Sequence, residues 1–180
     1  MRVIAGRLGG RRLKAPAGTL TRPTSDRVRE ALFAMLADVQ GTTVMDLFAG
    51  TGALGIEALS RGAERAVFVE RDGGVVRVLH ENLAALALES PLAEVRREDV
   101  LAALQSALAR QETYDLIFID PPYRQAPEWG PGLSSVLASV LEAGARVVVE
   151  SDRRAPLELD LDVERSRRYG DTSITIHRHQ

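Results

Sequence analysis

The 180-residue chain contains no cysteine, which excludes disulfide bonds and thiolate metal sites. Its three histidines are scattered and form no recognisable ligand set, so we expect no bound metal. No uninterrupted apolar run approaches the roughly 18 residues of a membrane span, and the first residues lack the apolar core of a signal peptide. We therefore expect a cytoplasmic protein with no membrane partner.

Low-complexity tracts are also absent, and 45% of the residues are hydrophobic. A chain of this length and composition fits one compact domain that buries roughly 70% of the surface of its unfolded state. We expect a single domain over residues 1–180, with a basic hairpin extension at 1–22 and the core of the fold at 23–180.

The small net charge of −2 hides an uneven distribution. Residues 1–30 hold eight basic and two acidic side chains, a net charge of +6, which leaves −8 for the remainder. A basic segment on an acidic body is typical of proteins that dock on phosphate, and arginine suits bidentate contacts. The alternative is a solvated surface with local ion pairs. The candidate RNA-binding residues are Arg7, Arg11, Arg12, Lys14, Arg22, Thr24, Arg27 and Arg29.

The apolar pattern predicts alternating strands and helices after an N-terminal hairpin turning at Gly9-Gly10. An amphipathic helix is expected from Thr24 to Val39, with Arg27 and Arg29 off its apolar face. Strands are expected at 43–48, 66–70, 94–97, 116–120 and 146–150, helices at 53–61, 73–88, 100–109 and 133–141, and a closing antiparallel pair at 163–168 and 173–178. This order predicts an α/β fold of Rossmann-like type, with a mostly parallel seven-stranded sheet, helices on both faces and an antiparallel last strand.

A glycine loop follows the first predicted strand, where Gly50 to Gly55 match G-x-G-x-x-G. Missing side chains there let the backbone approach a ligand at the start of a helix. Glu70 lies 20 residues after Gly50, at the end of the second strand, where a carboxylate can accept hydrogen bonds from two ribose hydroxyls. The pair indicates a nucleoside cofactor, and both a nicotinamide nucleotide and S-adenosylmethionine fit it.

Asp46 favours S-adenosylmethionine, because a carboxylate four residues before Gly50 would repel a pyrophosphate and attract the cationic end of the methyl donor. Asp99 can accept from an adenine amine or cap the helix that begins at Val100, and the two roles are compatible. Phe48 is either core or a wall of the cofactor site. The predicted cofactor-binding residues are Asp46, Phe48, Ala49, Gly50, Thr51, Gly52, Glu70, Arg71, Asp99 and Val100.

The run Asp120-Pro121-Pro122-Tyr123 closes the apolar segment 116–119. Neither proline has an N–H to donate, so carbonyls face outward beside a flat ring, and the site can seat a planar group that bears an amine. The ring of Tyr123 would stack on this planar group, a contact that is worth roughly 1 to 3 kcal/mol when the group is a nucleobase. Asp120, Pro121, Pro122 and Tyr123 are the predicted catalytic residues.

These motifs together resemble the class I S-adenosylmethionine-dependent methyltransferases, and Asp120 to Tyr123 resemble the (D/N/S)-P-P-(Y/F) motif of those that methylate exocyclic amines on nucleobases. The segment Arg22-Pro23-Thr24-Ser25-Asp26-Arg27-Val28-Arg29-Glu30-Ala31-Leu32-Phe33 resembles the bacterial 16S rRNA guanine-N2 methyltransferase family. Val3 to Gly6, Gly10 to Leu13 and Arg168 to Thr172 are similar to that family too. Ala5 departs from an expected Gly-Gly pair, and the stretch 124–130 looks like an insert whose Trp129 anchors a loop or gates the site.

The resemblance implies methylation of a guanine N2 amine in 16S rRNA, with S-adenosylmethionine as cofactor. It implies 16S rRNA as partner, within a protein-bound 30S subunit or an assembly intermediate, and we expect a monomer. One alternative is a DNA methyltransferase acting on adenine N6 or cytosine N4, because the same motif serves those amines. A NAD-dependent oxidoreductase would share the glycine loop and Glu70 but would not explain Asp46 or Asp120. A non-catalytic RNA-binding module is a third alternative.

Overall fold

The computed structural model describes residues 1–16, 25–36, 38–122 and 126–180. Of the predicted site residues, Arg22, Thr24 and Tyr123 lie outside these ranges. The helices are α1 (Asp26–Leu36), α2 (Ala53–Ser60), α3 (Gly73–Ala85), α4 (Val100–Ala109), α5 (Ala126–Leu137) and the short 3-10 helix η2 (Ala138–Val140). The strands are β1 (Thr43–Leu47), β2 (Arg65–Val69), β3 (Ala93–Arg96), β4 (Tyr114–Ile119), β5 (Leu141–Asp152), β6 (Asp162–Tyr169) and β7 (Thr172–Arg178).

The seven strands form one sheet in the order β3-β2-β1-β4-β5-β7-β6. Neighbouring strands from β3 to β5 are parallel, whereas β7 is antiparallel to both β5 and β6. The predicted mixed sheet with an antiparallel last strand is therefore confirmed. Helical crossovers between the first five strands give each of them the same direction, so their carboxyl ends meet at one edge of the sheet.

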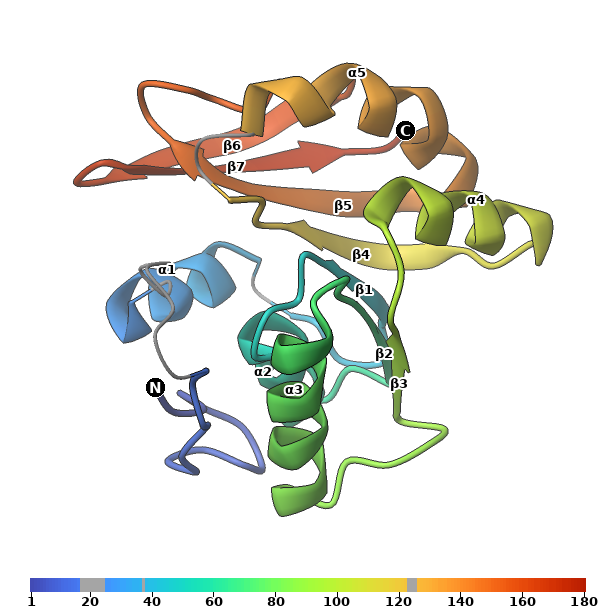
Figure 1. The fold of residues 1–180 in the computed structure, drawn as a ribbon. Coiled ribbons are helices and arrows are strands. Elements are labelled where there is room, and N and C mark those ends of the chain that lie inside the picture. Colours follow the sequence, from blue (N-terminus) through green and yellow to red (C-terminus); the bar gives the residue numbers. More distant parts are fainter. Residues whose placement is uncertain (17–24, 37, 123–125) are drawn as a thin grey trace.

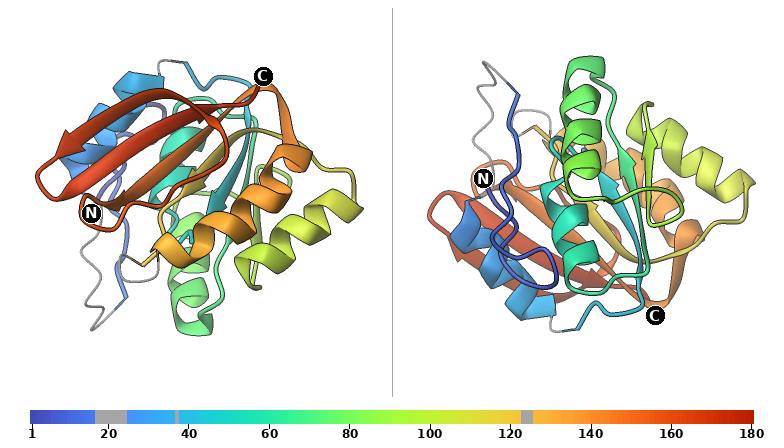
Figure 2. Two further views of the ribbon diagram at one scale, coloured as in Figure 1. Left: turned by 90° about the horizontal axis from the view of Figure 1, so that it is seen from above. Right: turned by 90° about the horizontal axis from the view of Figure 1, so that it is seen from below.

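Helices cover both faces of the sheet (Figure 1). The helices α1, α2 and α3 lie on the face seen from below, and α4 and α5 lie on the face seen from above (Figure 2). Alternate residues of each buried strand enter the two cores, so that Phe68 and Phe118 pack under α1 to α3 while Val67 and Ile117 pack under α4 and α5. No helix in the described residues is long and apolar enough to cross a membrane.

The helix predicted at 133–141 is wrong in its bounds, because α5 already begins at Ala126. Two prolines and two glycines between 127 and 132 obscure the helical pattern in the sequence. In the folded protein, tertiary packing overrides the low helix propensity of these residues. Gly130 is one reason, since a Cβ there would lie 2.5 Å from the backbone oxygen of Glu158. The stretch predicted to be an insert loop is thus partly helix, and Trp129 lies on its first turns.

The N-terminal segment folds back on itself as predicted, with an antiparallel bridge between Arg2 and Arg12 and backbone hydrogen bonds between residues 1–3 and 10–13. It is held mainly by α2. The buried carboxylate of Glu57 accepts hydrogen bonds from the backbone N–H groups of Ile4 and Ala5, at 2.7 and 3.0 Å, and from Arg61 Nε at 2.7 Å. Gly6 permits the contact, because a Cβ at this position would overlap the backbone of Ser60.

We expect Glu57→Ala to lower the free energy of unfolding by roughly 3 kcal/mol, because it leaves two backbone donors and a guanidinium without their acceptor. Urea unfolding of the variant beside Glu64→Ala measures the effect, since Glu64 is exposed and provides a matched loss of one carboxylate. Equal unfolding midpoints for the two variants would show that Glu57 does not anchor the segment.

Candidate active site

Four predicted strand ends converge at the carboxyl edge of the sheet. Leu47 of β1 pairs with Val69 of β2 and Ile119 of β4, and Ile119 pairs with Val149 of β5. The next residues along these strands, Glu70, Phe48, Asp120 and Glu150, therefore follow at steps of about 4.8 Å. The structure thus brings the glycine loop and the Asp120-Pro121-Pro122 run together, as the sequence predicts.

Glu70 holds the glycine loop in place. Its carboxylate accepts hydrogen bonds from the backbone N–H of Gly50 at 3.1 Å and from that of Asp72 at 2.9 Å. Each carboxylate oxygen keeps a further lone pair, so Glu70 can still accept from the hydroxyls of a ribose. Asn82, which the sequence analysis missed, supports the loop from below by donating to the carbonyl of Thr51 at 3.0 Å.

Asp46 lies beneath the loop and is only 2% exposed. Its carboxyl accepts a hydrogen bond from the backbone N–H of Gly55 at 2.9 Å, across the start of α2. Burial raises the pKa of Asp46 to about 8, the hydrogen bond from Gly55 opposes this rise, and the nearby charge of Glu70 adds to it. Desolvation thus favours the protonated form of Asp46 in the cofactor-free protein, whereas the sequence led us to expect a charged carboxylate.

Asp99 caps α4, accepting from the backbone N–H of Leu101 at 3.0 Å, and its carboxylate remains exposed beside the buried Val100. Both roles predicted for Asp99 are open to it. Asp72 caps α3 in the same way, and its hydrogen bonds from the backbone N–H groups of Val75 and Gly74 lower its pKa. Arg71 is exposed next to Asp72.

Phe48 forms an aromatic pair with Trp129 from the first turns of α5. The two ring centroids lie 5.0 Å apart with the planes at 77°, an edge-to-face arrangement. Both side chains are half-buried, and Phe48 has a φ of 62°, which is strained for a residue with a side chain. The pair gives the site an apolar wall, and Trp129 is a residue that sequence reasoning did not assign.

Asp120 and the prolines leave β4 at the same edge. Asp120 is half-buried, Pro121 is buried and Pro122 is exposed. Because Pro121 and Pro122 have no N–H, their backbone offers carbonyl acceptors and no donors. Such a lining fits an amine better than an acid.

The residues present fit S-adenosylmethionine. Gly50 has a φ of 56°, and only the Phe48 carbonyl, at 3.8 Å, would meet a Cβ there, so the loop backbone is open to a ligand. Around it, Glu70 and Asp99 offer acceptors suited to ribose hydroxyls and an adenine amine. Glu70, Asp99, Phe48 and the loop Ala49 to Gly52 would hold the cofactor. The described residues form no group of three or more side chains able to hold a metal ion.

The side chain of Arg29 does not lie where the sequence led us to expect it. It was expected off the apolar face of α1, but its side chain is fully buried, donating to Asp26 at 2.8 Å and to the backbone carbonyl of Arg2. The N-terminal segment covers it, so Arg29 holds that segment and does not face RNA. Arg27 is exposed as expected.

The predicted RNA-binding residues Arg7, Arg11, Arg12 and Lys14 are exposed, but they differ in position. The backbone N–H of Arg7 donates to Ser60 at the end of α2 that is farther from the glycine loop, and Arg11 donates to the carbonyl of Ala85 at the end of α3. Lys14 lies closer, since its backbone bonds to Asn82. Lys14 therefore lies nearer the glycine loop than Arg7 and Arg11 do.

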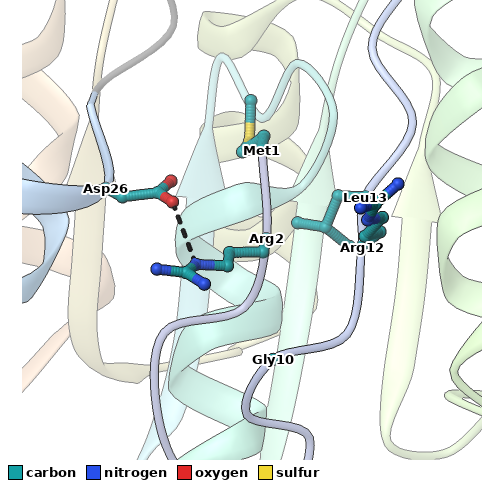
Figure 3. A pocket seen from close by; sticks show the side chains of 6 residues that line it. All are labelled: Met1, Arg2, Gly10, Arg12, Leu13 and Asp26. Atoms are coloured by element: carbon teal, nitrogen blue, oxygen red, sulfur yellow. Dashed lines mark ion pairs between the residues drawn. The ribbon is translucent and has the colours of Figure 1, made fainter.

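A hollow of about 490 Å³ lies between the N-terminal segment and α1 (Figure 3). It is lined by Met1, Arg2, Gly10, Arg12, Leu13 and Asp26. Arg2, which the sequence analysis did not select, pairs there with Asp26 at 3.3 Å. Met1 Sδ lies 3.7 Å from Thr51 Oγ1, so the hollow adjoins the glycine loop.

Residues 1–178 match the family model described as "Conserved hypothetical protein 95". The chain belongs to this family. It is 41% identical over 187 residues to the "Putative rRNA methyltransferase YlbH" of Bacillus subtilis (strain 168), covering 99% of this chain and 98% of that relative. It is 42% identical over 127 residues to Ribosomal RNA small subunit methyltransferase D of Escherichia coli (strain K12), covering 69% of this chain and 61% of the relative.

The solved structure of the "Putative methyltransferase yhhF" from Escherichia coli superposes with a TM-score of 0.81 at 33% identity, covering 100% of this chain and 98% of that one. The solved structure titled "A putative sam-dependent methyltransferase from Streptococcus mutans" shares the fold at 15% identity, with a TM-score of 0.73 over 88% of this chain and 50% of that one. These relatives are named methyltransferases, which favours that class over the oxidoreductase alternative. The protein is a methyltransferase enzyme of the S-adenosylmethionine-dependent class.

Proposed function

We propose that this enzyme methylates the exocyclic N2 amine of a guanine in 16S rRNA. The observation that carries the proposal is the position of Asp120 and Pro121, one strand spacing from the glycine loop that follows β1. Small-subunit rRNA as substrate is supported by the name of the Escherichia coli relative. The choice of guanine N2 rests on the resemblance of Asp120 to Tyr123 and of the segment before the glycine loop.

The chemistry requires positioning rather than covalent catalysis. A guanine N2 amine is a poor nucleophile, because its lone pair is delocalised into the ring, so the site must stabilise the nitrogen as it gains positive charge. The Asp120 carboxylate and the Pro121 carbonyl can accept its two N–H groups and direct its lone pair. When bound, S-adenosylmethionine supplies an electrophilic methyl group at this position. Alignment of amine and methyl group lowers the barrier through orientation.

The proton lost from the amine passes to the Asp120 carboxylate or to water. The Phe48–Trp129 wall keeps part of the site apolar, which strengthens the interaction between the carboxylate and the developing charge. Because the amine must reach the end of β4, the guanine has to be unstacked, which costs least in a loop. A loop within a protein-bound 30S subunit or an assembly intermediate, bound by a monomer, is the substrate form we propose.

The test is transfer of labelled methyl groups from S-adenosylmethionine to small-subunit particles and to deproteinised 16S rRNA, both from cells that lack the activity. Nucleoside analysis then identifies the product. N2-methylguanosine in the wild-type reaction, and its much slower formation with Asp120→Asn, is the expected result. Label in DNA as N6-methyladenine or N4-methylcytosine would move the protein to the alternative class, and no transfer to any nucleic acid would contradict the proposal.

A further inference from the structure

The outer edge of the sheet is uncovered on both faces. All of β6 from Asp162 to Arg168 is exposed, and the connection from β5 to β6, residues 153–161, contains no helix to cover it. The strands β6 and β7 form a hairpin. Five exposed arginines lie in the half of this hairpin near its turn or in the connection that follows β5: Arg153, Arg154, Arg165, Arg167 and Arg168. We call these five residues the hairpin patch.

The patch lies at the same edge of the sheet as the active site. Because β7 is antiparallel to β5 and β6, β6 runs in the direction of β4. Tyr169 at its end pairs with Thr172, which pairs with Asp152 at the end of β5. In the register of the sheet, Arg167 lies level with Asp120 and three strand spacings, roughly 14 Å, away from it. The turn between β6 and β7 and the start of α5 lie on one side of the molecule (Figure 1).

The charges on β6 are not evenly spread. Its acidic residues, Asp162 and Glu164, occupy the half away from the active site, whereas Arg165, Arg167 and Arg168 occupy the half beside it. Among the described residues, these three arginines form no ion pair. Arg154 lies 3.8 Å from Asp171, but both side chains are well exposed and such a pair is weak. The guanidinium groups therefore remain available to an anionic partner.

The arginines also face two directions. Arg165 and Arg167 pair with Ile176 and Ile174, so they lie on the face covered elsewhere by α1. Arg168 pairs with Ser173 and lies on the opposite face. An edge strand with guanidinium groups on both faces can contact a chain of phosphates that passes across the edge.

Exposed edge strands often carry charges that prevent pairing with other chains. This explanation accounts for charged residues on β6 but not for their segregation, since acids would serve equally well. The chain as a whole has a net charge of −2, so a basic cluster beside the active site is not a consequence of composition.

We propose that the hairpin patch binds the phosphate backbone of the substrate RNA a few nucleotides from the target base. This inference rests on the proposed function. The N-terminal segment, with Arg12 and Lys14, lies against α2 and α3 on the other side of the site. The RNA is thereby held across the carboxyl edge of the sheet from both sides, with the target nucleotide between them.

The experiment compares Arg167→Gln/Arg168→Gln with Arg110→Gln/Arg178→Gln. The control removes the same charge from exposed arginines at the ends of α4 and β7, both at the opposite edge of the sheet. The substrate is whichever of 16S rRNA or the small-subunit particle the wild-type enzyme methylates. Affinity is measured over a range of salt concentrations, together with KM, kcat and binding of S-adenosylmethionine.

The patch variant is expected to bind RNA about 10-fold more weakly at physiological salt. The slope of the logarithm of its affinity against the logarithm of the salt concentration is expected to be smaller in magnitude by about 1 to 1.5. Its KM for RNA rises while kcat and cofactor binding stay at the wild-type level, and the control resembles the wild type. A slope equal to that of the control overturns the inference, and so does aggregation of the patch variant without a change in slope, which indicates edge protection alone. If the wild type methylates no RNA, the proposed function itself fails, which is a distinct result.

Discussion

Replacing Asp120 with asparagine is expected to lower kcat for methyl transfer by about 10²- to 10³-fold while leaving the affinity for S-adenosylmethionine near its wild-type value. Asparagine keeps an acceptor oxygen of similar size but not the negative charge that stabilises the amine as it becomes cationic. Asparagine also presents an NH₂ group, which repels an amine in the orientation that catalysis requires. The loss therefore falls on the transition state rather than on binding.

Single-turnover transfer of labelled methyl groups measures the rate, and calorimetry measures cofactor binding. Asp115→Asn is the matched control, because Asp115 lies at the other end of β4 and accepts a hydrogen bond from the backbone N–H of Thr43 at 2.8 Å. An amide oxygen can replace that acceptor. Loss of cofactor binding with a normal rate at saturation would assign Asp120 to the cofactor site and remove it from the proposed mechanism.

The order of strands and helices could be predicted from the sequence because each element has its own period and boundary. The helix predicted at 100–109 is confirmed residue for residue, since Asp99 caps it and apolar residues repeat at helical spacing. The helix α5 could not be found in full. Its first turns contain Pro127, Gly130 and Pro131, which lower the local helix propensity, and the close approach of Gly130 to the backbone of Glu158 is a tertiary contact that propensity does not contain.

The active site was predictable to the extent that it lies at strand ends. Parallel strands place their carboxyl ends together, so Gly50, Glu70 and Asp120 converge from positions far apart in the sequence. Contacts made across the surface were not predictable. Arg29 has the same charge as Arg27 but is buried against a segment 27 residues earlier, and Trp129 contacts Phe48, which is far from it in the sequence.

The protonation state of Asp46 could not be predicted from the sequence either, because it depends on the burial of the side chain in the folded protein. We expect Asp46→Asn to remove a loss of stability that the wild-type protein suffers as the pH rises. The folded-state pKa of Asp46, about 8, lies above its ordinary value of 3.8, so the folded protein keeps a proton that the unfolded chain releases. The stabilising contribution is complete below about pH 4 and is lost as the pH rises toward 8.

The wild-type free energy of unfolding should therefore fall relative to that of the variant by up to about 1.4 kcal/mol per pH unit within this window. Over the whole window the difference reaches a few kcal/mol. Asparagine carries no proton to lose, and its side-chain oxygen can still accept from the backbone N–H of Gly55. Urea unfolding of the cofactor-free proteins between pH 5 and pH 8, on the order of one pH unit apart, measures the difference, with Asp115→Asn as the matched control.

A difference that stays constant with pH would show that Asp46 is already ionised in the folded protein. That result would restore the charged carboxylate that the sequence suggests beneath the glycine loop. A difference that grows with pH would instead mean that Asp46 keeps its proton in the folded protein until the pH approaches 8. Because a cation near Asp46 favours its ionised form, saturating S-adenosylmethionine should then reduce the difference at pH 7, which the same unfolding experiment can measure.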